Sequence, residues 1–252
     1  MTKCVLITGA AKRVGREIAL SLAKQGWSIA LHYHHSEQEA SALKQELETL
    51  GVRSITLKAD LQNEQEVSTL ITRTINELGT IDCLINNASA FINDTVVTHS
   101  RTNWDMHMET NLRAPVLLMQ QFAVQMPQGI QGNIINMLDY CVWKLPEQFF
   151  SYAISKSALW TATQMLAIAL APSIRVNAIG PGHLLPNHYQ TQESFATLAA
   201  RSPLGHSTSI EEVCNAITFI LSTPSLTGQM IALDSGLHLA NQPYGFVSKA
   251  KD

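Results

Sequence analysis

The chain has 252 residues, of which 46% are hydrophobic, so it contains enough apolar material for a sizeable globular core. Its 17 Lys and Arg against 20 Asp and Glu give a formal net charge of −3, which excludes a global basic field for binding nucleic acid or an anionic membrane. Charged residues make up only 15%, below the roughly 25% that is usual in a soluble domain.

Short β-branched runs alternate with longer amphipathic stretches along the chain. Several of the short runs are apolar on both faces, as central parallel strands covered by helices are. This alternation predicts an α/β fold: one Rossmann-like, doubly wound parallel sheet of seven strands flanked by helices, in a single domain over residues 1–252. The predicted strands are Cys4–Thr8, Ser28–Tyr33, Ser54–Ala59, Cys83–Asn86, Asn133–Leu138, Arg175–Ile179 and Met230–Leu233. The predicted helices are Gly15–Gln25, Glu37–Leu50, Glu64–Leu78, Arg101–Met126, Ser151–Ala171 and Ile210–Leu221.

A glycine-bearing turn, Thr8-Gly9-Ala10-Ala11-Lys12-Arg13-Val14-Gly15, follows the first predicted strand and opens the first helix. Gly9 and Gly15 allow a tight turn, and the helix N-terminus offers free N–H groups to a pyrophosphate. The position at strand one favours dinucleotide binding over a turn without a ligand. Lys12 and Arg13 add cationic donors there, or form a solvated surface pair.

The end of the second strand distinguishes between two dinucleotides. NAD enzymes hold the ribose 2′-hydroxyl with a carboxylate there, whereas this chain has Tyr33-His34-His35-Ser36. The missing acid, together with Lys12 and Arg13, favours the 2′-phosphate of NADP. His32 and His34 share one strand face and suggest a metal site, but no third ligand follows from the spacing and we predict no metal. Asp60-Leu61, which ends strand three, either holds the adenine or forms an ordinary turn.

Tyr152 and Lys156 are spaced i, i+4 and therefore lie on one face of a helix. An ammonium group one turn away from a phenol favours the phenolate, so we expect Lys156 to lower the pKa of Tyr152 towards neutrality. By itself the pair fits an ordinary surface pair as well. Combined with the glycine turn, it indicates an acid/base site.

With these motifs the chain resembles the classical short-chain dehydrogenase/reductases over essentially its whole length. Further matching motifs are Asn86-Asn87-Ala88, Asn111, Gly180-Pro181-Gly182 and Thr227-Gly228…Asp234-Ser235-Gly236. The resemblance implies Tyr152 as acid/base, Lys156 on the nicotinamide ribose and Asn111 as the anchor of a water relay. The expected contacts of an NADP(H) cofactor are Thr8, Gly9, Lys12, Arg13, Val14, Tyr33, His34, His35, Ser36, Asp60, Leu61, Asn87, Ala88, Ser89, Tyr152, Lys156, Pro181 and Gly182.

Two departures from the commonest family pattern narrow the resemblance to the pteridine reductase and dihydromonapterin reductase branch. Arg13 replaces a glycine of the turn, and Asp139 stands where the catalytic serine is usual. A carboxylate repels a developing alkoxide but helps to bring a proton to a ring nitrogen. The resemblance implies a substrate site of Arg13, Ser89, Phe91, Asp139 and Tyr152, with the pterin stacked between nicotinamide and Phe91. The alternative interpretation of Phe91 is a core aromatic in the loop after strand four.

We therefore expect an NADPH-dependent oxidoreductase that reduces a dihydropterin, dihydromonapterin or dihydrofolate to the tetrahydro form. The alternatives are a carbonyl reductase for another small molecule and a non-catalytic NADP-binding sensor. The segment 183–201 is expected to cover the substrate. The helices Arg101–Met126 and Ser151–Ala171, by resemblance, form a homotetramer interface, and a neighbouring subunit would order the tail 241–252. Neither nucleic acid nor a membrane is an expected partner.

Scattered cysteines and the absence of a secretion-type apolar stretch predict a cytoplasmic protein with reduced thiols. The four cysteines, Cys4, Cys83, Cys141 and Cys214, lack CxxC spacing. Cys141, two residues beyond Asp139, either lines the pocket or is an inert thiol.

Overall fold

A computed structural model describes residues 2–186 and 189–240. Within them, seven strands form one sheet in the order β3-β2-β1-β4-β5-β6-β7, and every neighbouring pair is parallel. The strands are β1 (Cys4–Ile7), β2 (Ser28–Tyr33), β3 (Ser54–Lys58), β4 (Cys83–Asn86), β5 (Gly132–Met137), β6 (Ile174–Pro181) and β7 (Met230–Leu233). The predicted doubly wound sheet is confirmed.

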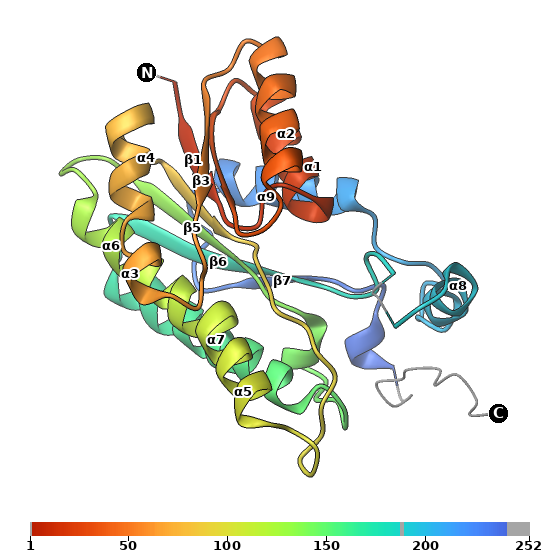
Figure 1. Ribbon diagram of the computed structural model, residues 1–252. Coiled ribbons are helices and arrows are strands. Elements are labelled where there is room, and N and C mark those ends of the chain that lie inside the picture. Colours follow the sequence, from red (N-terminus) through yellow and green to blue (C-terminus); the bar gives the residue numbers. More distant parts are fainter. Residues whose placement is uncertain (1, 187–188, 241–252) are drawn as a thin grey trace.

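Helices cover both faces of this sheet (Figure 1). One layer contains α1 (Arg13–Lys24), α2 (Glu37–Thr49) and α9 (Ile210–Ser222). The opposite layer contains α3 (Glu64–Val67), α4 (Leu70–Leu78), α5 (Arg101–Met108), α6 (Ala114–Gln125) and α7 (Phe150–Ala169). Along β1, Val5 and Ile7 pack in the first layer and Cys4 and Leu6 in the second, as the two-residue period of a strand requires.

Two long predicted helices are interrupted. Glu64–Leu78 is divided into α3 and α4, because the hydroxyls of Ser68 and Thr69 donate to carbonyls of the preceding turn and compete with the helical backbone. Between α5 and α6 lies a π-helical turn, η1 (Glu109–Arg113), which widens the helix just before Pro115. Proline lacks an N–H and crowds the carbonyl four residues earlier, so a wider turn accommodates it.

The remaining elements lie at the carboxyl ends of the strands. They are η2 (Tyr140–Val142), α8 (Gln192–Ala200) and η3 (Leu237–Leu239), and α8 stands beyond the ends of β6 and β7 (Figure 1). The predicted substrate segment 183–201 contains α8, whereas residues 187–188 of it and the whole tail 241–252 lie outside the described residues. The single domain over residues 1–252 stays a prediction.

Strand order reverses between β1 and β4, because the chain continues from β1 to one side of the sheet and returns to the other. In open α/β sheets, ligands bind in the crevice outside the carboxyl ends of the strands at such a switch point. Thr8, Asn87, Leu138 and Gly182 directly follow or end β1, β4, β5 and β6 at this edge. No helix in the described part of the chain is long and apolar enough to cross a membrane.

Candidate active site

Hydrogen bonds join the glycine turn after β1 to the turn after β4. Thr8 Oγ1 accepts hydrogen bonds from the N–H groups of Asn87 (2.9 Å) and Ala88 (3.0 Å), and Asn87 Nδ2 donates to the carbonyls of Thr8 (2.9 Å) and Gly9 (3.1 Å). A Cβ on Gly15 would lie 2.3 Å from Gly9 O and 2.7 Å from Asn87 Nδ2. The turn therefore requires glycine at position 15.

His32, which the sequence offered as half of a metal pair, supports the glycine turn. It is buried in β2; its Nδ1 accepts from the N–H of Gly9 (3.1 Å), and its Nε2 lies 3.1 Å from the carbonyl oxygen of Ala59. Burial lowers the pKa of His32 to about 4, so the ring is neutral at physiological pH. Residues 2–186 and 189–240 contain no group of three His, Cys, Asp or Glu placed to hold a metal ion.

Charged and aromatic partners surround the end of β2. Lys12 Nζ lies 2.5 Å from Glu39 Oε1, the rings of His34 and His35 stack at 3.5 Å, and His34 Nε2 lies 3.8 Å from Asp60 Oδ2. Lys12 and His35 line a surface hollow on this side of the molecule. The other residues predicted for this end of the cofactor are Tyr33, which is buried in β2, Ser36 before α2, and Leu61, which is buried after β3.

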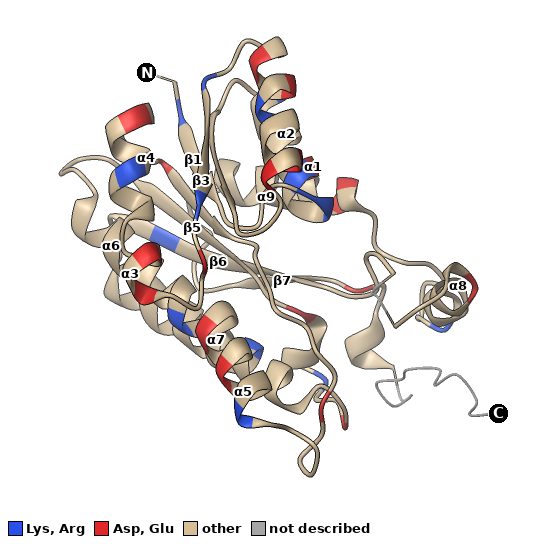
Figure 2. Ribbon diagram, viewed as in Figure 1, with Lys and Arg blue, Asp and Glu red and all other residues tan. Residues whose placement is uncertain are grey.

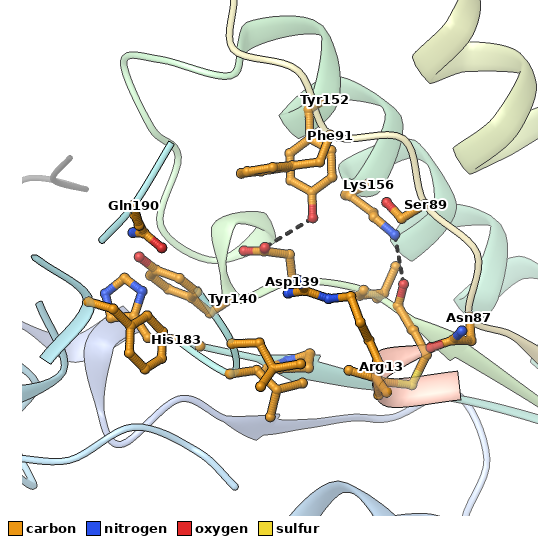
Figure 3. Close-up of a pocket in the computed structure, with 18 residues that line it drawn as sticks. Arg13, Asn87, Ser89, Phe91, Asp139, Tyr140, Tyr152, Lys156, His183 and Gln190 are labelled. Atoms are coloured by element: carbon orange, nitrogen blue, oxygen red, sulfur yellow. Dashed lines mark hydrogen bonds between the residues drawn. The ribbon is translucent and has the colours of Figure 1, made fainter. Parts of the chain in front are cut away.

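The predicted acid/base residues meet between the carboxyl end of β5 and the start of α7 (Figure 3). Tyr152 Oη donates to Asp139 Oδ2 (3.0 Å), while Asp139 Oδ1 accepts from the N–H of Cys141 (2.8 Å). Lys156 Nζ donates to the carbonyl of Met137 (2.8 Å) and lies 5.7 Å from the centre of the Tyr152 ring. The hydrogen-bond partner of the tyrosine hydroxyl is thus the carboxylate and not the ammonium group.

This geometry overturns the expected direction of the Tyr152 pKa. Burial, and then the charge of Asp139, raise the pKa of Tyr152 well above its usual value. Burial also raises the pKa of Asp139, opposed by hydrogen bonds from Cys141 and Tyr152 and by the charge of Lys156. The pKa of Lys156 is lowered by burial to about 8. The i, i+4 spacing placed Tyr152 and Lys156 on one helix face, and the resemblance pointed to Asp139, but neither gave information on how deeply the three groups are buried.

Asn111 lies in the π-helical turn η1 and holds the loop after β4. Its Oδ1 accepts from the N–H of Ala90 (2.7 Å) and lies 3.3 Å from Ser89 Oγ. Its Nδ2 donates to the carbonyl of Ala90 (3.0 Å) and to Ser155 Oγ (3.1 Å). A water relay from Asn111 stays a prediction.

A cleft of about 450 Å³ opens between these groups and the segment after β6. All five predicted substrate residues line it, together with Val14, Asn87, Lys156, Pro181 and Gly182 of the predicted cofactor set (Figure 3). The other predicted cofactor residues do not line it and lie along the ends of β1, β2, β3 and β4; they are Thr8, Gly9, Lys12, Tyr33, His34, His35, Ser36, Asp60, Leu61 and Ala88.

Aromatic side chains border the cleft on two sides: the predicted Phe91 on one, and His183 and Phe195, which the sequence did not single out, in the segment after β6. Phe91 stacks on buried Phe149 with ring centres 4.4 Å apart and meets the edge of Tyr152 at 4.7 Å. His183, from the segment after β6, lines the side opposite Phe91 (Figure 3), and the ring centre of Phe195 lies 6.5 Å from that of His183. Only residues 183–201 as a whole were expected here, because a chain segment without regular periodicity gives no signal for individual contacts.

Two further predicted residues have defined surroundings. Arg13 has a φ of 52° and donates from Nη2 to the carbonyl of Pro186 (3.0 Å), so it joins the glycine turn to the segment after β6. Cys141 is buried, and burial followed by the charge of Asp139 raises its pKa well above the usual value. Its thiol therefore stays protonated, as expected for an inert cysteine.

Comparison with known proteins agrees with this arrangement. The family model described as enoyl-(acyl carrier protein) reductase matches residues 9–238. The crystal structure of FolM alternative dihydrofolate reductase 1 from Brucella canis, complexed with NADP, is 39% identical in sequence, with a TM-score of 0.93 over 96% of each chain. The corresponding Brucella suis protein with NADP is 39% identical, with a TM-score of 0.92 over 96% of this chain and 97% of that one.

A more distant group of relatives has a different named substrate. The 3-oxoacyl-[acyl-carrier-protein] reductase FabG of Staphylococcus aureus (strain Mu50 / ATCC 700699) is 28% identical over 244 residues, which cover 95% of this chain and 99% of the relative. The family match over most of the chain, the parallel sheet and the helix that carries Tyr152 and Lys156 all indicate the same family. The chain belongs to the short-chain dehydrogenase/reductase family of oxidoreductases.

Proposed function

We propose that the protein uses NADPH to reduce a dihydropterin, such as dihydromonapterin or dihydrofolate, to the tetrahydro form. The observation that carries this proposal is the 3.0 Å hydrogen bond between Tyr152 and Asp139, which places a buried carboxyl beside the proton donor. The two Brucella FolM proteins, named as alternative dihydrofolate reductases and complexed with NADP, support both the substrate class and the cofactor.

The glycine turn fits a dinucleotide pyrophosphate. The first residues of α1 receive no hydrogen bond from a capping side chain, and no acidic side chain stands in the first turn to repel an anion. A side chain at Gly15 would fill the space that the turn keeps clear. In this proposal Lys12 binds the 2′-phosphate, Asn87 and Gly182 border the nicotinamide, and Lys156 holds its ribose.

The residues around Asp139 suit proton transfer to a ring nitrogen. Bound NADPH supplies the hydride, which goes to the imine carbon of the pterin while the adjacent nitrogen takes a proton. Because its pKa is raised, Tyr152 keeps its proton until the substrate nitrogen accepts it. Asp139, whose pKa is also raised, then takes up a proton from solvent and passes it to Tyr152, so that both groups regain their starting protonation states.

This chemistry argues against a ketone as the substrate. Reducing a ketone places negative charge on oxygen, and a carboxylate next to that oxygen destabilises the transition state. An imine nitrogen that takes its proton as the hydride arrives carries positive charge, which the same carboxylate stabilises. The carboxyl at position 139 thus favours the pterin.

Steady-state NADPH oxidation tests the proposal. Wild-type protein is expected to oxidise NADPH with dihydromonapterin, dihydrobiopterin or dihydrofolate, and Tyr152→Phe is expected to lower kcat by about 10²–10⁴-fold because it removes the proton donor. No turnover with any of these pterins would contradict the proposal. A Tyr152→Phe protein that turns over at the wild-type rate would contradict the role of Tyr152.

A carbonyl reductase is the second candidate, favoured by the FabG relatives and by the description of the family model. Asp139→Ser separates the two candidates, since a hydroxyl does not repel an alkoxide. The pterin reductase loses pterin turnover in this variant, whereas an enzyme built for a carbonyl substrate gains turnover with that carbonyl. A panel of pterins and small carbonyls, assayed with both proteins, gives the answer.

We further propose that the protein is a homotetramer and is located in the cytoplasm. Helix α6 carries no charged residue and α7 carries only Lys156, whereas the colours of charged residues mark α1, α2 and α4 in Figure 2. Val124, Met165 and Ile168 on these helices are exposed, with 79%, 66% and 82% of their surfaces accessible. Apolar helix faces of this kind are typical of interfaces between subunits.

A further inference from the structure

The helix that carries Tyr152 and Lys156 is capped by a distant loop. Phe149 precedes α7 in the left-handed conformation, with φ of 59°, and offers no capping side chain. Instead, Asn93 Oδ1 accepts from the N–H of Phe149 (3.2 Å), the carbonyl of Asp94 accepts from Phe150 (3.1 Å), and Asp94 Oδ1 accepts from Ser151 (3.0 Å). The loop after β4 thus satisfies the first N–H groups of α7, which a helix leaves unpaired.

Asp94 is suited to this position by its charge. Only 3% of its surface is accessible, and a carboxylate so deeply buried is stabilised by N–H donors and by the positive end of a helix. Its second oxygen, Oδ2, accepts a short hydrogen bond from Ser151 Oγ. Asp94 therefore fixes the direction in which the Ser151 hydroxyl donates.

His107 on α5 extends this chain of hydrogen bonds back to the loop. The ring is fully buried; Nε2 lies 3.1 Å from the backbone nitrogen of Ile92, and Nδ1 lies 2.7 Å from Ser151 Oγ. Because a backbone N–H can only donate, Nε2 must accept, and Nδ1 must carry the proton and donate to Ser151. The proton order is therefore fixed along His107, Ser151 and Asp94.

The two ends of this hydrogen-bond network lie next to two residues of the cleft. Ile92 follows Phe91, and Ser151 precedes Tyr152. Phe91 and Tyr152 touch each other edge to face at 4.7 Å, and the His107 ring lies 6.0 Å from the Tyr152 ring. The proposed proton transfer uses none of the three polar groups. A fully satisfied buried network specifies one arrangement of the segments that it joins.

We propose that Asp94, Ser151 and His107 are positioning residues that hold Phe91 and Tyr152 in their mutual arrangement on one side of the cleft. Their effect on turnover rests on the proposed role of Tyr152. Their effect on the backbone at Ile92 and Ser151 does not depend on any activity.

Asp94→Asn tests the proton order with almost no change in volume. Its Oδ1 still accepts from the N–H of Ser151, but its amide NH₂ must donate to Ser151 Oγ, which then has to donate to His107 Nδ1. The ring must now carry its proton on Nε2, where it opposes the N–H of Ile92. The substitution at position 94 thus removes the hydrogen bond at Ile92, because its effect passes through Ser151 and His107 to the N–H of Ile92.

Hydrogen-exchange mass spectrometry on peptides covering residues 89–94 measures this directly. We expect exchange at Ile92 to accelerate by about ten- to a hundredfold in Asp94→Asn, as follows from the loss of a buried hydrogen bond. The matched control is Asp105→Asn, an exposed aspartate of α5 paired with Arg101, which should leave exchange unchanged. Exchange in Asp94→Asn equal to that of the wild type and of the control would overturn the inference.

His107→Asn provides a second, independent variant. Its Nδ2 can replace Nδ1 as the donor to Ser151, but it offers no acceptor to Ile92. We expect exchange to accelerate in residues 89–94 while the start of α7 stays protected. If Asp94→Asn does not fold, His107→Asn decides by itself, and unchanged exchange at Ile92 then overturns the inference.

Kinetics provide the functional readout. Both variants should lower kcat for pterin reduction by about tenfold or more, in keeping with the sensitivity of catalysis to small displacements, with the Kd for NADPH unchanged within about twofold. A rise in KM alone, with unchanged kcat, would refute the positioning role. Wild-type protein that reduces no pterin would refute the proposed function instead, and the exchange data would still decide the inference about the network.

Discussion

Acidification should destabilise the protein through one buried histidine. His32 accepts a hydrogen bond from the N–H of Gly9 and lies 3.1 Å from the carbonyl of Ala59, and only 2% of its surface is accessible. With Nδ1 accepting, Nε2 carries the single proton and donates to Ala59. A second proton on Nδ1 would oppose the Gly9 N–H in a site that water does not reach.

The size of the effect follows from the difference between the two pKa values. Burial lowers the pKa of His32 from 6.5 to about 4 in the folded protein. Between these values the unfolded chain binds more protons than the folded one, so stability rises with pH over this window. The stability that depends on neutral His32 is fully present above pH 6.5 and is lost as the pH falls towards 4. It amounts to about 3 kcal/mol in total. About 2 kcal/mol of it is lost between pH 7.5 and 5.

Urea unfolding of the wild type and of His32→Asn at both pH values measures this loss. The Asn side chain keeps an acceptor near the Nδ1 position but does not titrate. His107 and His183, whose pKa values burial also lowers, are present in both proteins, so their contributions cancel in the comparison. We expect the wild type to lose about 2 kcal/mol more than the variant on acidification. Equal losses in the two proteins would refute the assignment of His32 as a buried neutral acceptor.

Three further predictions concern the cofactor site and the assembly. In Gly15→Ala the new Cβ would lie 2.3 Å from Gly9 O, so the variant should be destabilised by about 1–3 kcal/mol in thermal melting. It should also fail to bind NADPH in a fluorescence titration, and wild-type affinity for NADPH would show that the turn can shift to accommodate a methyl group. Lys12→Ala should raise the Kd for NADPH by about tenfold and leave that for NADH nearly unchanged, whereas equal effects on both would exclude Lys12 from the 2′-phosphate. Light scattering should give four times the chain mass of 27.7 kDa, and a monomer would contradict the proposed tetramer.

Local sequence patterns predicted the fold well, because each strand and helix has its own periodicity. The predicted strands Ser28–Tyr33, Cys83–Asn86 and Met230–Leu233 agree with β2, β4 and β7 in both bounds. The i, i+4 spacing placed Tyr152 and Lys156 on one helix face without knowledge of their surroundings. Where two helices are interrupted, the cause is also local, namely Pro115 and the hydroxyls of Ser68 and Thr69.

The low charge content that the sequence showed is consistent with uncharged outer faces on α6 and α7. By contrast, nothing in the sequence indicated that His32 supports the glycine turn; its spacing from His34 raised only the alternative of a metal pair, for which no third ligand was predicted. The direction of the Tyr152 pKa was predicted wrongly for the same kind of reason. Burial and the hydrogen bond to Asp139 dominate it, and neither can be derived from the distance between residues along the chain.

The amino-acid sequence by itself determined the sheet, the glycine turn and the placing of Tyr152 and Lys156 on one helix face, because these depend on neighbours within a few residues. Only the tertiary structure decided how the groups act on one another. Asp94 and Ser151 are 57 residues apart, and His107 and Ser151 are 44 apart. Hydrogen bonds over such separations, and the exclusion of water that sets each pKa, exist only after the sheet and its helices have packed together.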